Sequence, residues 1–155
     1  MMLSESSARR PHNQPSEVMS ATALLMPLAV GMVGLCLGMQ AVIAARGSEI
    51  DLLALALVGT VVLFYFGFLV WRRDELPKVR FGSLAAHAVT YVVVNGSFQL
   101  HAWSLAMANS DVLRGDGDLP IDGGWLGITF GMAGFWAIGF AAHAVASIRQ
   151  RGFEK

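Results

Sequence analysis

The sequence predicts an all-α integral membrane protein: a four-helix bundle made of two transmembrane hairpins, with the N- and C-termini in the cytoplasm. Of its 155 residues, 55% are hydrophobic and only 14% are charged, against about 25% charged residues in a typical soluble domain. Four stretches carry no Asp, Glu, Lys or Arg, and each reaches the roughly 20 apolar residues that a spanning helix needs. They are Val18–Ala45, Leu52–Trp71, Phe81–Ser110 and Gly123–Ile148.

The order of these stretches divides the chain into three parts. Residues 1–17 are polar, contain two prolines and show no apolar periodicity, which predicts a disordered cytoplasmic tail. Residues 18–71 form the first hairpin, whose two helices are joined by the short segment ARGSEID. Pro77 favours a break before the next helix. Residues 78–150 form the second hairpin, which has a long loop rich in Gly and Asp.

The distribution of basic residues predicts the orientation. With the N-terminus inside, nine Lys and Arg residues fall in cytoplasmic segments and two fall in outer loops. Because cytoplasmic loops carry an excess of Lys and Arg, both termini are expected in the cytoplasm, and the protein is expected to be multi-pass in a bacterial plasma (inner) membrane. The two outer basic residues are Arg46 and Arg114.

His87 and His143 are the strongest candidates for a functional site. His87 follows Arg80 by seven residues, and His143 precedes Arg149 by six. At 1.5 Å rise per residue, both lie roughly 9–10 Å in from the cytoplasmic charges. Consecutive helices of a hairpin are neighbours, so the two rings are expected to meet. An ionisable residue inside a bilayer is a functional-site hypothesis by default.

Two interpretations of this pair remain open. In one, the imidazoles hydrogen-bond to each other or to backbone and stabilise the hairpin. In the other, they are the axial ligands of a haem b, with Tyr91 and Asn95 as supporting polar residues of the cofactor site. Haem iron is the only metal that this second interpretation includes. Small neighbours such as Gly139 are compatible with both.

Other polar and aromatic residues of the spans receive structural interpretations. Asn95 lies mid-span, where an unpartnered amide is costly, so it is expected to bond across helices. His101 is interpreted as a water-exposed or belt-level histidine near the outer end of its helix. Trp103 and Trp125 fit an outer aromatic belt. Two GxxxG motifs would let helix backbones approach closely, within the bundle or between protomers; they are Gly34/Gly38 and Gly127/Gly131.

Several activities find no support in the sequence. No nucleophile elbow, zinc-protease motif, phosphate-binding loop or dinucleotide fingerprint is present. The formal net charge is zero, which gives no basic surface for nucleic acid. The chain contains a single cysteine, Cys36, so no intrachain disulfide forms. We therefore expect no catalytic residues and no enzymatic activity.

The C-terminal half resembles the bacterial 2TM domain, a small family with two transmembrane helices. The matching segments are FGSLAAHAVTYVVVNGSFQLHAW and WAIGFAAHAVASI, within residues 78–150. By position, the family pattern falls on His87, Tyr91, Asn95 and His143. The chain departs from that pattern by having Trp136-Ala137-Ile138-Gly139 where the family has a tighter Gly-Trp-Gly. The resemblance implies a membrane hairpin and no particular reaction.

The resulting functional expectation is a non-enzymatic membrane module. It would serve as an accessory or sensory subunit and act through helix contacts with a second copy or with another membrane protein, surrounded by membrane lipid. The alternative is a b-type cytochrome that transfers electrons through a haem between the third and fourth helices. An optical spectrum separates the two.

Overall fold

The computed structural model describes residues 20–115 and 118–151, and within these ranges all regular structure is helical. The long helices are α1 (Ala21–Ala45), α2 (Leu52–Trp71), α3 (Gly82–Met107) and α5 (Ala133–Arg151). Short helical segments connect them: η1 (Leu76–Lys78), η2 (Asp111–Leu113), α4 (Gly123–Leu126) and η3 (Gly127–Met132). The all-helical prediction is therefore confirmed. The predicted tail, with its residues 1–17, lies outside the described ranges.

Helix ends coincide with the residues that terminate the apolar stretches. The side chain of Ser20 caps α1 by accepting from the Ala23 N–H, and Asp51 caps α2 by accepting from the Ala54 N–H. Gly82 begins α3 directly against η1, where a Cβ atom would collide with the Leu76 carbonyl oxygen. That close approach sets where α3 starts, and so where His87 lies.

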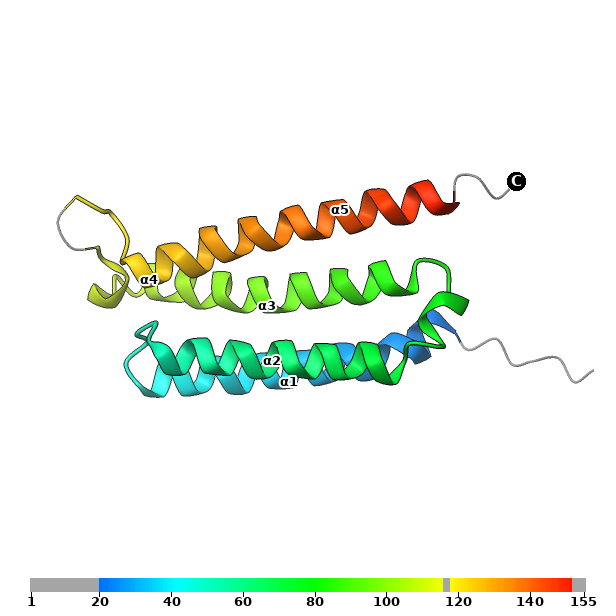
Figure 1. The fold of residues 1–155 in the computed structure, drawn as a ribbon. Coiled ribbons are helices and arrows are strands. Elements are labelled where there is room, and N and C mark those ends of the chain that lie inside the picture. Colours follow the sequence, from blue (N-terminus) through cyan, green and yellow to red (C-terminus); the bar gives the residue numbers. More distant parts are fainter. Residues whose placement is uncertain (1–19, 116–117, 152–155) are drawn as a thin grey trace, which may run out of the picture.

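Helix α3 occupies the middle of the fold, with α1 on one side and α5 on the other (Figure 1). Helix α2 packs against α1, and α5 packs chiefly against α3. The core lies mainly along α1, whose buried side chains repeat every three or four residues, as a helix packed on one face requires. They are Leu24, Leu28, Met32, Cys36, Met39 and Ile43.

Three helical stretches are long and apolar enough to cross a membrane, namely Ala21–Ala45, Leu52–Trp71 and Gly123–Arg149. Helix α3 is not among them, although it carries no charged residue and has the length. Its polar side chains lower its mean hydropathy, so a fourth span stays a prediction. These side chains include His87, Thr90, Asn95, Ser97, Gln99 and His101.

The last helical stretch has an irregular start. Between α4 and α5 the backbone widens into a π-helical segment, η3 (Gly127–Met132). A π turn displaces the ordinary i→i−4 pairing and leaves backbone groups that need other partners. Side chains of α3 supply two such partners. The Gln99 amide donates to the Thr129 carbonyl at 2.7 Å, and the Tyr91 hydroxyl donates to the Ala133 carbonyl at 3.3 Å.

Candidate functional site

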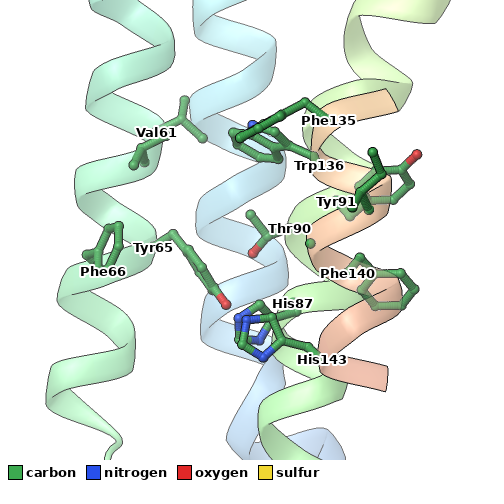
Figure 2. A pocket seen from close by; sticks show the side chains of 13 residues that line it. Val61, Tyr65, Phe66, His87, Thr90, Tyr91, Phe135, Trp136, Phe140 and His143 are labelled. Carbon is green, nitrogen blue, oxygen red and sulfur yellow. The ribbon is translucent and has the colours of Figure 1, made fainter. Parts of the chain in front are cut away.

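The rings of His87 and His143 lie against each other, with centroids 4.6 Å apart and planes tilted by 35°. The meeting predicted from their matched depth is confirmed. Tyr65 of α2 joins them, its ring edge-on to His87 at a centroid distance of 5.5 Å (Figure 2). Three helices therefore contribute a polar ring to one place.

The hydrogen bonding of His87 identifies its free nitrogen. Its Nδ1 lies 2.7 Å from the carbonyl oxygen of Ser83, one turn earlier on the same helix. A carbonyl only accepts, so Nδ1 carries the proton and donates. The neutral ring then has an unshared electron pair on Nε2. This arrangement, with one ring nitrogen tied to backbone, is the one that commonly prepares a histidine to bind a ligand through the other.

The hydroxyl of Tyr65 is the second unsatisfied group. Its oxygen is buried, and no hydrogen-bond partner for it is present among the described residues. Figure 2 shows it pointing toward the two imidazoles. A buried hydroxyl without a partner costs about 1–3 kcal/mol, so this position is unfavourable unless something else completes the site.

A cavity of about 560 Å³ adjoins these groups and lies between α2, α3 and α5. Its walls are mainly aromatic and aliphatic, and no charged side chain lines it. Tyr91 stacks on Phe140 at one wall, with ring centroids 5.7 Å apart. We call this space the histidine cavity; its lining includes Val61, Tyr65, Phe66, His87, Thr90, Tyr91, Phe135, Trp136, Ile138, Gly139, Phe140 and His143.

The spacing of the two rings tests the haem interpretation. A metal–imidazole bond of about 2 Å on each side would place the centroids of two axial rings roughly 6 Å apart. The observed ring centroids are closer, at 4.6 Å. An iron atom does not fit between them in this arrangement, and α5 would have to move away from α3 to admit one.

The packing interpretation is met in part: His87 bonds to backbone, as predicted, but among the described residues this bond does not cross to the neighbouring helix. Within the described part of the chain, the only hydrogen bond of His87 runs to its own helix, and none joins it to His143. Asn95 behaves similarly: its amide donates to the Tyr91 carbonyl of the same helix at 2.9 Å, while its Oδ1 is buried without a partner. The expected bond from Asn95 across helices is therefore wrong.

At the opposite end of α3, His101 belongs to a satisfied network. Its Nδ1 donates to Gln40 Oε1 at 2.7 Å, which leaves Nε2 to accept from the Ser48 hydroxyl at 3.2 Å. The Gln40 amide donates onward to Ser97 at 3.1 Å. His101 is therefore not simply water-exposed, because the ring is partly buried and links α1, the α1–α2 loop and α3; its level in a membrane stays a prediction.

Trp125 anchors the same end. It is fully buried, its indole N–H donates to the Ser48 carbonyl at 3.0 Å, and its ring meets His101 edge-on at 5.1 Å. Its assignment to an aromatic belt is wrong, because the α3–α4 connection folds it inward. Trp103, by contrast, is 64% exposed.

The four glycines of the GxxxG motifs are not used inside the chain. A Cβ atom added to Gly34, Gly38, Gly127 or Gly131 would meet nothing within 4 Å. The close approach of α1 to α2 occurs at Gly31, over the ring of Phe64. The described residues contain no group of three His, Cys, Asp or Glu side chains that could hold a metal ion.

Comparisons with known proteins found no family model, curated protein or solved structure that matches the chain. The resemblance to the 2TM domain stays a prediction. Tyr65 is the site residue that sequence reasoning missed as a member of the histidine cavity, since it lies in the first hairpin and no spacing rule connects it with His87.

Proposed function

We propose that this chain is a four-span integral membrane module that catalyses no reaction and transmits a signal through the position of α5. The observation that carries the proposal is the loose attachment of α5. This helix packs chiefly against α3, and no side chain along its described length is fully buried. Its large apolar side chains are instead exposed, including Phe135 at 76% and Ile138 at 73%.

Such surface suits lipid or another helix far better than water. Helices α1 and α2 likewise expose Leu37, Leu52 and Leu63 at 65%, 79% and 72%. A helix held on one side only can shift or bind a partner at low cost, which favours an accessory or sensory role. The unused Gly34 and Gly38 of α1 offer a close-packing face for a second copy.

In-membrane cysteine cross-linking tests this proposal. In a Cys36→Ser background, Gly34→Cys and Ile138→Cys place single thiols on the exposed faces of α1 and α5, and Met32→Cys, on a buried position of α1, is the control. We expect a cross-linked dimer from at least one exposed position and none from the control. Reporter fusions at both ends should report the cytoplasm. A monomer with no cross-link at either face, or an external C-terminus, contradicts the proposal.

A b-type haem site is the second candidate, favoured by the free Nε2 of His87 facing a histidine on the next helix. It requires α5 to move outward, because the rings are too close to hold iron between them. The optical spectrum of the protein expressed with added haem decides it. A Soret band lost in both His87→Ala and His143→Ala would establish haem, and a colourless protein would remove it.

A further inference from the structure

The histidine cavity ends in a hydrogen-bond donor and an acceptor that the protein leaves unused. The donor is the Tyr65 O–H, which is buried and has no partner among the described residues. The acceptor is Nε2 of His87, because Nδ1 is already committed to the Ser83 carbonyl. A ligand that satisfies both would combine oxygen atoms able to accept with, in one of its forms, a hydroxyl able to donate.

The walls restrict the rest of that ligand. No charged side chain lines the cavity, so a phosphate, carboxylate or ammonium group would enter without a counter-charge. Aromatic rings line much of the rest of the cavity, among them Trp136 and Phe140. Flat rings pack well against such walls in offset or edge-on contact. The ligand is therefore neutral and its head is planar.

The size and the rim of the cavity indicate where the ligand comes from. About 560 Å³ is within the usual range for small-molecule sites. Phe66, Phe135 and Ile138 line the cavity and are themselves 58%, 76% and 73% exposed, so its mouth lies at the apolar outer surface. A molecule entering by this route arrives from the hydrocarbon of the bilayer.

From this combination we propose that the histidine cavity binds the head of a membrane-dissolved quinone. A quinone carbonyl accepts from the Tyr65 hydroxyl, and a hydroxyl of the reduced quinol donates to Nε2 of His87. The two redox forms thus make different hydrogen bonds at one site, which is the differential contact a sensor requires. The inference rests on the proposed sensory module and gives its ligand class; the protein itself transfers no electrons in it.

The matched pair of tyrosines makes the test sharp. The chain has two tyrosines, and both line the cavity. The Tyr91 hydroxyl already donates to the Ala133 carbonyl, whereas that of Tyr65 has no partner in the described part of the chain. The full-length protein in lipid nanodiscs is titrated with decylubiquinone and with its quinol, and quenching of tryptophan fluorescence is followed. Trp136 is the tryptophan that lines the cavity.

We expect saturable quenching by the wild type. Tyr65→Phe should weaken quinone binding about tenfold, as for the loss of one hydrogen bond, while Tyr91→Phe, whose lost hydroxyl is bonded to the Ala133 carbonyl rather than free for a ligand, should weaken it less. His87→Ala should weaken the quinol more than the quinone. Decylbenzene, which has the tail and a ring but no oxygen, should not compete.

Thermal unfolding without ligand guards against misfolded variants. Tyr65→Phe removes an unpartnered hydroxyl and should unfold at the same or a higher temperature than the wild type. Quenching that does not saturate, equal affinity in Tyr65→Phe, competition by decylbenzene, or a destabilised Tyr65→Phe would each overturn the proposal. Absence of quinone binding in a protein that still cross-links would remove the ligand and leave the proposed module in place. A monomer that binds quinone would remove the proposed helix-contact module and leave quinone as the ligand of the histidine cavity.

Discussion

The two ends of α3 place histidines in opposite situations. At one end, both ring nitrogens of His101 are hydrogen-bonded, and a fully buried Trp125 covers the ring. About 21 Å along the helix, His87 has one nitrogen bonded within its own turn, while the other has no hydrogen-bond partner among residues 20–115 and 118–151 and lies beside a cavity. A satisfied polar network makes an end rigid, whereas unsatisfied groups in a cavity leave room for a ligand. Residue type alone therefore does not separate a structural histidine from a binding one.

Among the substitutions that test the difference between the two ends of α3, we expect the largest loss of stability from one at Trp125. Trp125→Ala leaves a cavity beneath His101 and removes the indole bond to Ser48, so it should lower the free energy of unfolding by about 3–5 kcal/mol. The exposed Trp103→Ala is the matched control and should change it by less than about 0.5 kcal/mol. Unfolding by a denaturing detergent from mild micelles measures both. Equal effects would mean that the His101 end is not a packed anchor.

The histidines themselves come next. His101→Ala leaves the side chains of Gln40 and Ser48 without their hydrogen-bond partner and should lower the free energy of unfolding by about 1–3 kcal/mol. His143→Ala, at an exposed position whose ring makes no hydrogen bond to any described residue, should cost less than about 0.5 kcal/mol. The same detergent titration ranks them. A reversed order would move the structural role to the histidine cavity.

The π-helical turn supplies a smaller test between the two ends. Gln99→Leu removes the bond to the Thr129 carbonyl and should cost roughly 1 kcal/mol, the scale of interhelical hydrogen bonds in membranes. The informative readout is local: amide hydrogen exchange should quicken within Gly127–Met132 and leave α1 unchanged. Leu100→Ala, an exposed neighbour, serves as the control. Unchanged exchange in η3 would show that Gln99 does not hold the turn.

The smallest effect concerns Asp51, at the start of α2. The Ala54 N–H, 2.9 Å from its Oδ1, holds the pKa of this carboxyl below its ordinary value of 3.8, and Arg46 adds to this. Because this pKa is lower in the folded than in the unfolded state, the ionised carboxylate stabilises the folded state at pH values above the unfolded pKa. That stabilisation is lost as the pH falls through the lowered, folded-state pKa. Asp51→Asn still caps the helix and should remove only this acid dependence. Helicity measured between pH 6 and pH 2 tests it, and an identical pH profile in both proteins would contradict it.

Several features of the fold followed from the sequence because they depend on local chemistry. Helix bounds follow the charge-free stretches, since apolar length and capping residues such as Ser20 and Asp51 are written along the chain. The meeting of His87 with His143 was predictable because a constant rise per residue converts equal distances from the charged ends into equal depth. Antiparallel neighbours then bring the rings together.

Other features were decided only by the tertiary structure. Trp125 is buried rather than at a surface because the α3–α4 connection and η3 turn it inward, and His101 finds Gln40 and Ser48 because of how α1 and α3 are rotated. Tyr65 reaches His87 from another hairpin. Sequence spacing determines depth along one helix, but which face a helix presents depends on packing summed over all its neighbours. That sum is what separates the satisfied histidine from the free one.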